Sequence, residues 1–142
     1  MGRLKLGAAI MTTGWTDTSS NPSWASMRDV ALSAEQVGFD TLWVADELLT
    51  ESKDWEEPAG WWECVAVMAA MAEATDSVAL GTWVLSALHR SPGLTVKVAE
   101  TIDEISGGRF IFGLGAGHSA RQGEAFGFPS DKVIGRYEEA LE

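Results

Sequence analysis

The chain has 142 residues, 46% of them hydrophobic and 22% charged, which is typical of a soluble globular domain with one core. Its net charge of −11 argues against nucleic-acid binding, and no apolar run reaches the roughly 20 residues of a membrane span. A single cysteine, Cys64, excludes an internal disulfide and suits a reducing cytoplasm. Neither it nor the two histidines have metal-ligand spacing, so we expect no metal site.

Four short apolar runs divide the chain, and a helix-patterned stretch follows each of them. They span residues 4–10, 41–45, 78–84 and 109–115. A helical crossover must carry the chain back before the next strand begins, so repeated units of this kind form parallel strands. The second run is apolar at consecutive positions, which predicts a strand covered on both faces. We expect one domain of α/β class, with no boundary or second module.

The first two strands are each followed by a helical pattern. Ser23 can cap the first helix, and Gly38 has the conformational freedom for its left-handed end. The second helix comes after a long acidic connection. In both helices, apolar residues recur with the 3.6-residue period of a buried face. They are Met27, Val30, Ala31, Ala34 and Val37 in the first helix, and Trp62, Val65, Ala66, Ala69 and Ala72 in the second.

The second half of the chain repeats this pattern. The dipeptide Ser-Pro at 91–92 predicts the start of a third helix, and Gly-Gly at 107–108 predicts its end. The residues expected on its buried face are Leu94, Val98, Ile102 and Ile105. Beyond the fourth strand, residues 116–129 have the composition of a glycine-bearing loop. Ser130 or Asp131 can then cap a last helix.

The carboxyl ends of the four strands define one potential binding rim. Ligands of parallel α/β proteins bind beyond these ends, which selects residues 11–14, 46–47, 84–89 and 115–118. This inference depends on topology alone and on no motif.

The fourth strand ends in Gly-Leu-Gly-Ala-Gly, whose last three residues are Gly115, Ala116 and Gly117. Residues 115–120 formally fit the dinucleotide fingerprint G-x-G-x-x-A. However, they follow the fourth strand, and the residues about 20 further on lie in a helical pattern, which argues against a nicotinamide site. Two interpretations remain open: small residues that let a flat ring approach the backbone, or a tight turn without a ligand.

Several side chains at the rim could carry chemistry. Asp46 could bind a substrate hydroxyl, relay a proton or cap a short helix. His118 is placed to meet a ligand as acid, base or hydrogen-bond donor, whereas His89 more simply supports the start of the third helix. Trp15 and Trp83 lie at or near the rim and could flank a ring system or an apolar substrate.

Five stretches of the chain form a recognisable series. They are Asp-Thr-Leu-Trp-Val-Ala-Asp at 40–46, Val-Ala-Leu-Gly-Thr-Trp-Val at 78–84, Arg-Ser-Pro at 90–92, Ser-Gly-Gly-Arg-Phe at 106–110 and Arg-Tyr-Glu-Glu-Ala-Leu at 136–141. The fourth, which leads into Gly-Leu-Gly-Ala-Gly, is the most specific. In this order they resemble the N-terminal half of the bacterial luciferase-like flavin-dependent oxidoreductases, and the likeness covers essentially the whole chain.

The resemblance implies a fold, a cofactor and a set of site residues. The family fold is a (β/α)₈ TIM barrel that binds FMN or the deazaflavin coenzyme F-420 at the carboxyl ends of its strands. Its members transfer a hydride, or activate dioxygen to oxygenate a small organic substrate. Likeness of the Gly-Leu-Gly-Ala-Gly-His region slightly favours the deazaflavin. The implied cofactor contacts are Thr82, Trp83, Val84, Gly115, Ala116 and Gly117, and the implied catalytic residues are Asp46 and His118.

Two details refine this expectation. In many family members the third strand carries a bulge with a cis non-proline peptide that supports the ring, and the Trp83–Val84 bond is the candidate here. Many relatives also place a histidine after the aspartate of the second strand. This chain has Glu47 at that position, which leaves the proton-transfer group open.

The length of the chain sets a last expectation. A full (β/α)₈ barrel takes about 250 residues, and its phosphate site typically uses loops after strands seven and eight. We therefore expect residues 1–142 to be a single partial domain, the N-terminal half of a barrel. It would be a fragment of a longer enzyme, or a half that pairs with a C-terminal half or another copy. The alternative function is a non-catalytic half-barrel or paralogue that acts as a structural subunit.

Overall fold

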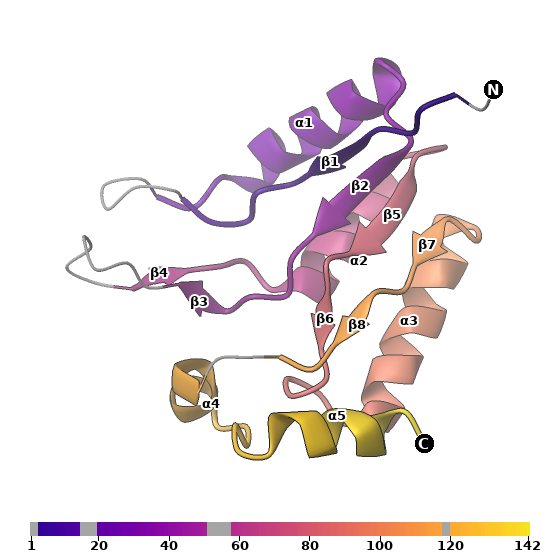
Figure 1. The fold of residues 1–142 in the computed structure, drawn as a ribbon. Coiled ribbons are helices and arrows are strands. Elements are labelled where there is room, and N and C mark those ends of the chain that lie inside the picture. Colours follow the sequence, from indigo (N-terminus) through magenta and orange to yellow (C-terminus); the bar gives the residue numbers. More distant parts are fainter. Residues whose placement is uncertain (1–2, 15–19, 51–57, 118–119) are drawn as a thin grey trace.

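The computed structural model describes residues 3–14, 20–50, 58–117 and 120–142. Its main elements alternate along the chain (Figure 1), and none of the described helices is long and apolar enough to cross a membrane. In chain order they are β1 Gly7–Ala9, α1 Trp24–Gln36, β2 Thr41–Val44, α2 Cys64–Ala74, β5 Ala79–Thr82, α3 Pro92–Ser106 and β7 Phe110–Ile111.

The four strands form one parallel sheet in the order β1-β2-β5-β7. Trp43 lies in register with Ala9 on one side and with Gly81 on the other, and Gly81 pairs with Ile111 of β7. Neighbours in sequence are neighbours in space, as the crossover argument predicts. The expected succession of parallel βα units is confirmed.

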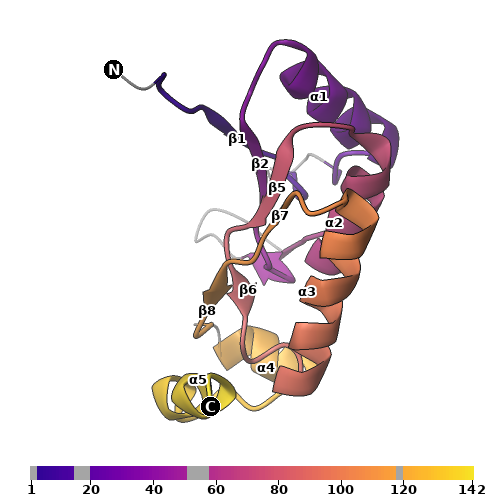
Figure 2. The same ribbon diagram turned by 90° about the vertical axis from the view of Figure 1, so that its right-hand side faces the viewer.

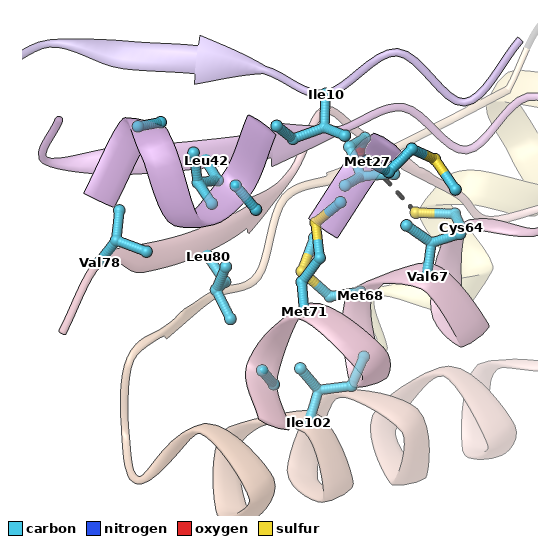
Figure 3. Packing of buried hydrophobic residues seen from close by; sticks show 14 of the residues in the cluster. Ile10, Met27, Leu42, Cys64, Val67, Met68, Met71, Val78, Leu80 and Ile102 are labelled. Atoms are coloured by element: carbon cyan, nitrogen blue, oxygen red, sulfur yellow. Dashed lines mark hydrogen bonds between the residues drawn. The ribbon is translucent and has the colours of Figure 1, made fainter. Parts of the chain in front are cut away.

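All three crossover helices lie on the same face of the sheet (Figure 2). Between them and the strands lies the core, where Leu42, Val44 and Leu80 are fully buried. In Figure 3, Leu42 and Leu80 lie in one cluster with Met68 and Met71 of α2 and Ile102 of α3. Packing of this kind removes the apolar face of each helix from water, which is the main source of stability.

Among the described residues, no helix lies on the opposite face of the sheet (Figure 2), so the expected covering of both faces of the second strand is not found there. Trp43 occupies much of this open face and is half-buried. A Cβ added at Gly7 would lie 2.6 Å from Trp43 Nε1, and one added at Gly81 would lie 2.3 Å from Trp43 Cζ3. Glycine on both flanking strands therefore leaves the room in which the indole lies.

The predicted ends of α1 and α3 are confirmed. Ser23 Oγ accepts a hydrogen bond from Ser26 N at 3.1 Å, and Ser91 Oγ accepts one from Leu94 N. Gly107 ends α3 in the left-handed conformation, with φ of 66°, which a residue without Cβ adopts at no steric cost.

The predicted buried faces are only partly right. Met27, Ala31 and Ala34 of α1 and Ile102 of α3 are buried, but Val30, Val37, Leu94 and Ile105 are exposed. In α2 the buried residues are Cys64, Val67, Met68, Met71 and Ala72. The predicted stripe of α2 shares only Ala72 with this set, because the helix turns a neighbouring face toward the core, and Val65 is only partly buried against it. Trp62 precedes the helix and donates its indole N–H to the Pro22 carbonyl.

Short elements extend the sheet at its carboxyl end. The third predicted strand, residues 78–84, contains β5, and β6 Leu85–Ser86 follows just beyond its predicted end. The fourth predicted strand divides into β7 and β8 Leu114–Gly115, and β6 pairs with β8 in parallel. The long acidic connection forms an antiparallel hairpin of β3 Leu49–Thr50 and β4 Ala59–Gly60.

Two helices follow β8, and the sequence prediction missed one of them. Helix α4, Ala120–Phe126, lies in the segment expected to be a loop. Helix α5, Val133–Ala140, forms as expected but begins without the predicted cap. Its preceding residue is Lys132, which has a left-handed backbone and makes no side-chain capping bond.

Candidate active site beyond the strand ends

A pocket of about 220 Å³ lies beyond the carboxyl ends of β2, β5 and β8. Ten residues line it: Asp46, Glu47, Trp83, Val84, Ser86, His89, Gly115, Ala116, Gly117 and Gln122. The structure thus brings together six of the eight residues predicted for the site, namely Asp46, Trp83, Val84, Gly115, Ala116 and Gly117. The other two are Thr82, which is not in the lining, and His118, which lies outside the described residues together with Trp15.

Trp83 and Val84 form the apolar wall of this pocket. The peptide bond between them is cis, as the resemblance predicts. The side chains of Trp83 and Val84 are 66% and 42% exposed, although the two residues lie between the strands β5 and β6. A large exposed indole next to polar groups is a surface that a flat or apolar ligand can cover.

Thr82 has a different position from the one expected of a cofactor contact. It is buried, its hydroxyl donates to the Gly113 carbonyl at 2.8 Å, and it accepts from the Gly113 N–H at 3.0 Å. This pair of bonds ties β5 to the segment between β7 and β8. The side chain of Thr82 therefore holds the sheet together below the pocket.

The glycine string owes its composition to contacts within the protein. A Cβ at Gly113 would lie 2.2 Å from the Thr82 carbonyl oxygen, one at Gly115 would lie 2.5 Å from Val84 Cγ2, and one at Gly117 would lie 2.4 Å from Ser86 Oγ. Alternate residues of one segment thus lie against alternate residues of the other. These glycines therefore let β6 and the residues next to it lie close to the backbone of the glycine string.

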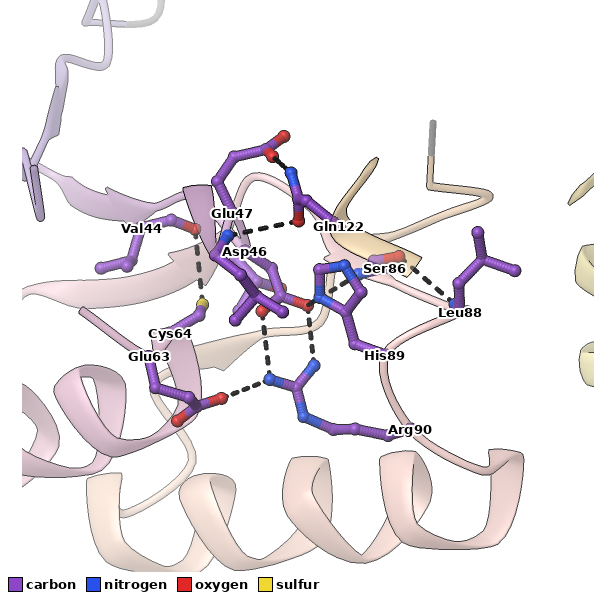
Figure 4. Close-up of polar contacts among 12 residues, drawn as sticks. Val44, Asp46, Glu47, Glu63, Cys64, Ser86, Leu88, His89, Arg90 and Gln122 are labelled. Atoms are coloured by element: carbon purple, nitrogen blue, oxygen red, sulfur yellow. Dashed lines mark hydrogen bonds and ion pairs between the residues drawn. The ribbon is translucent and has the colours of Figure 1, made fainter. Parts of the chain in front are cut away.

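Asp46 is the most densely bonded residue of the site. One oxygen, Oδ2, accepts from Ser86 N at 2.9 Å, Arg90 Nη1 at 2.7 Å and His89 Nδ1 at 3.2 Å, and Oδ1 accepts from Arg90 Nη2 at 3.0 Å (Figure 4). Burial alone would raise the pKa of Asp46, but the hydrogen bonds from His89 and Arg90 outweigh it and lower the pKa to about 2.

Arg90 extends this network to the beginning of α2. Its Nη2 also binds Glu63, whose carboxylate caps α2 by accepting from Ala66 N at 2.7 Å. Burial opposes the guanidinium charge, yet the bonds to Asp46 and Glu63 raise the pKa of Arg90 above its ordinary value. The loop after β6, the end of β2 and the start of α2 are thereby joined through one side chain.

Gln122 joins the far side of the pocket to the loop after β2. Its amide nitrogen donates to Glu47 and to the Leu49 carbonyl, and its oxygen accepts from Leu48 N at 3.3 Å. It is buried, although it lies in the short helix α4. Glu47, the residue that replaces the expected histidine, is therefore positioned by a partner from about 75 residues further along the chain.

His89 makes contacts within the site that the sequence did not indicate. Its ring is nearly buried, packs against Phe128 with centroids 4.7 Å apart and directs Nδ1 to Asp46. Ser86 lies in the predicted rim segment 84–89, but the sequence assigned no individual role to Ser86, Arg90 or Gln122. The motif Arg-Ser-Pro was a signal for Arg90, but nothing local marks Gln122, since its partners are distant in sequence.

Among the described residues, no group of three or more His, Cys, Asp or Glu side chains could hold a metal ion. The cysteine, Cys64, is buried under β2 with its sulfur 3.8 Å from the Val44 carbonyl oxygen, and burial raises the pKa of its thiol. The chemistry available in the pocket is therefore that of carboxylates, an imidazole, an amide and an aromatic wall.

Parallel βα units with a pocket at the strand ends define an α/β fold that matches part of a TIM barrel, and comparison with known proteins specifies its family. The model of the luciferase-like monooxygenase family matches residues 4–142. The chain belongs to this family. Its relatives are oxidoreductases and monooxygenases, among them proteins that use F-420 or a flavin.

Curated relatives and solved structures agree with this placement. The chain is 33% identical to 5,10-methylenetetrahydromethanopterin reductase of Archaeoglobus fulgidus over 77% of its length, and 35% identical to F-420-dependent glucose-6-phosphate dehydrogenase of Amycolatopsis mediterranei over 66%. It spans 29% and 28% of those proteins.

Two solved structures have the same fold at low sequence identity. An F-420-dependent secondary alcohol dehydrogenase with an F-420–acetone adduct superposes with a TM-score of 0.72 at 21% identity, over 96% of this chain and 37% of that one. A riboflavin lyase with modified FMN gives 0.78 at 19% identity, over 99% and 36%.

Proposed function

We propose that this chain supplies the ring-binding half of the active site of a flavin- or deazaflavin-dependent oxidoreductase. The observation that carries the proposal is the pocket in which exposed Trp83 and Val84 lie near the backbone of Gly115, Ala116 and Gly117. The two side chains offer a surface for the face of a flat ring, and the backbone offers polar groups for its edge.

The residues present fit the ring of such a cofactor and not its phosphate-bearing tail. A volume of about 220 Å³ is smaller than the roughly 300–1,000 Å³ of a complete ligand pocket. No lysine or arginine lines it, and neighbouring Arg90 already binds two carboxylates. Phosphates in TIM barrels are typically held after strands seven and eight, beyond the four βα units of this chain.

When bound, the ring would accept or donate a hydride. The part of this chain would be to hold the ring against Trp83 and Val84, and to present polar groups of Glu47 and Gln122 to the substrate. Asp46 would organise the site, because its oxygens are already occupied by four protein donors.

Between the two cofactors we favour the deazaflavin F-420, with hydride transfer to or from a small organic substrate. The F-420-dependent dehydrogenase of Amycolatopsis mediterranei supports this choice, as does the F-420-dependent alcohol dehydrogenase fold. Oxygenation is the second candidate reaction, because a 4-hydroxyprotoasukamycin monooxygenase is 31% identical over 82% of the chain. The lone cysteine supports a cytoplasmic location.

Titration of the full chain with F-420 and with FMN tests the ring site. Absorbance and fluorescence of the cofactor report binding. We expect measurable but weak binding, tighter for F-420, and a roughly tenfold loss in Trp83→Ala, since aromatic stacking contributes about 0.5–1.5 kcal/mol. Trp24→Ala is the matched control, because Trp24 is also exposed but lies on α1 away from the pocket. If Trp83→Ala and Trp24→Ala bound the cofactor with equal affinity, the proposed ring site at Trp83 would be contradicted.

We also propose that a C-terminal barrel half completes the fold. In the described sheet, β1 and β7 each pair on one side only. Beside β7, α3 and α5 enclose a groove of about 160 Å³ whose lining includes Val96, Phe112 and Leu141. These side chains are 63%, 44% and 62% exposed. Open strand edges with exposed apolar residues favour pairing with further βα units.

Size-exclusion chromatography with cofactor titration tests the missing half. We expect the C-terminal four βα units of a relative to bind the chain and to tighten F-420 binding. A monomer that retains FMN tightly by itself would contradict the proposal, and a stable homodimer would identify a second copy as the occupant instead. Redox inactivity of a cofactor-loaded complex would favour the non-catalytic half-barrel.

A further inference from the structure

We propose that His89 is the proton-transfer residue of this pocket, and that Asp46 fixes its tautomer so that Nε2 is presented to the substrate. The proposal deepens the proposed function, because it assigns the proton that accompanies hydride transfer. It also answers the question left open by Glu47, which occupies the position where many relatives have a histidine.

The position of His89 meets the geometric requirement for such a group. The residue lines the pocket, its side chain is 8% exposed, and Nδ1 lies 3.2 Å from Asp46 Oδ2. In Figure 4, the second ring nitrogen of His89, Nε2, points away from Arg90 and toward the side of the pocket where Gln122 lies. No hydrogen-bond partner of Nε2 is found in the described part of the chain.

The chemistry of Asp46 dictates which nitrogen carries the proton. An ionised carboxylate only accepts hydrogen bonds, so the imidazole nitrogen that faces it must be N–H. Asp46 remains ionised because Arg90 and the Ser86 N–H also donate to it. The neutral ring then has its lone pair on Nε2, the nitrogen that can take a proton from a ligand.

The surroundings of His89 hold this arrangement in place. Phe128 packs against the ring from the segment between α4 and α5, with an angle of 48° between the planes. The charged groups nearest to it among the described residues include Asp46 at Nδ1, Arg90 on the other side of that carboxylate, and Glu47 across the pocket. On its other side His89 shares a second pocket with Arg136 and Glu139 of α5. A ring fixed by a carboxylate and an aromatic neighbour is preorganised, which is what proton transfer to a bound substrate requires.

In the oxidation of an alcohol, His89 would take the proton that is released together with the hydride. The hydroxyl proton passes to Nε2 while the C–H hydride leaves for the oxidised deazaflavin, and the C–O single bond becomes a carbonyl. The substrate thus loses two electrons and one proton to the hydride acceptor, and a second proton to His89. In the reverse direction, the imidazolium returns its proton to the oxygen that develops negative charge.

The tautomer can be measured on the full chain without any turnover. His118→Asn leaves His89 as the single histidine, and ¹⁵N labelling of histidine then reports the protonation of each ring nitrogen by NMR. We expect the neutral ring to carry its proton on Nδ1 and a lone pair on Nε2, and a mixture of the two tautomers when Asp46→Asn is added. A predominant Nε2–H tautomer in the chain with Asp46 intact would overturn the proposal, whether or not the Asp46 variant folds.

Activity of the F-420-loaded protein provides the second test. His89→Asn keeps a donor for Asp46 but removes Nε2, and we expect kcat to fall by roughly 10²- to 10⁴-fold, with a small change in KM. Lys97→Ala, an exposed residue of α3, is the control and should leave kcat unchanged. An unchanged kcat in His89→Asn would reject the role. Failure to bind F-420 in a chain with the expected tautomer would instead remove the proposed cofactor and leave the assignment of Nε2 supported.

Discussion

Single side chains make the decisive connections in this molecule, and Arg109 is among the most extensively bonded of those that the structure describes. Its guanidinium donates to the carbonyls of Ala72, Thr75, Val78 and Ser106 and to the Thr75 hydroxyl, at distances from 2.6 to 3.0 Å. These acceptors lie at the ends of α2 and α3 and at the start of β5. Arg109 therefore satisfies carbonyls that helix ends leave without partners.

Substitution of Arg109 by alanine should destabilise the chain strongly. We expect a loss of about 3 kcal/mol or more in the free energy of unfolding, because several partly buried carbonyls would lose their donor. Urea denaturation measures the change. Arg3→Ala serves as the control, since Arg3 is 72% exposed in its ion pair with Asp40 and should contribute less than about 1 kcal/mol. Equal effects of the two substitutions would refute this account.

The Asp46 network predicts a specific pH dependence of stability. The pKa of Asp46 is lowered from 3.8 to about 2, so the folded state favours the ionised form. This stabilisation of about 2 kcal/mol is complete above pH 5 and is lost as the pH falls through 4 toward 2. Asp46→Asn should therefore cost most at pH 7, with a difference from the parent that narrows at pH 3. A constant difference in urea denaturation across this range would contradict the network.

At the scale of elements, the junction of β5–β6 with β7–β8 depends on close backbone approach. Gly113, Gly115 and Gly117 lie against Thr82, Val84 and Ser86 in alternation, and the two hydrogen bonds of Thr82 fix the register at Gly113. The indole of Trp43 uses the same device between Gly7 and Gly81. Small residues in these strands therefore mark positions where another part of the protein fills the space.

Alanine substitutions distinguish these glycines from permissive ones. Gly113→Ala places a methyl group 2.2 Å from a backbone oxygen that cannot rotate away, so we expect a loss of about 2 kcal/mol or more. Gly135→Ala in α5 meets no atom within 4 Å and should stabilise the chain by about 0.5–1 kcal/mol. Thermal unfolding followed by circular dichroism measures both. A stabilised Gly113→Ala variant would show that the junction can open without cost.

At the scale of the whole molecule, the sheet has helices on one face and two unpaired edges. A closed barrel would bury Trp43, Ile111 and the open face inside its lumen, where layers of side chains fill the interior. In this chain Ile111 is 38% exposed. Exposed apolar residues include those where the next βα units of a barrel would lie, at the groove beside β7 and along the outer face of α1.

A charge placed in that groove should separate folding from association. Val96 is 63% exposed, so Val96→Glu should change the free energy of unfolding by no more than about 0.5 kcal/mol. The same substitution should weaken binding of a C-terminal barrel half at least tenfold, because it would bury an unpaired carboxylate. Glu100→Gln on the same helix is the control for charge. Isothermal titration calorimetry that finds equal affinities would exclude this groove as the interface.

The sequence by itself determined the parallel βα succession, the caps of α1 and α3, the cis peptide at Trp83–Val84 and most of the pocket lining. These follow from local patterns, since strand runs, capping residues and a family motif are all contained in short segments. Only the tertiary structure decided that Asp46 is saturated by His89, Arg90 and Ser86, that Thr82 binds Gly113, and that Gln122 reaches Glu47. Those contacts join residues 31 to 75 positions apart, and their partners are chosen by how the elements pack, which no local pattern records.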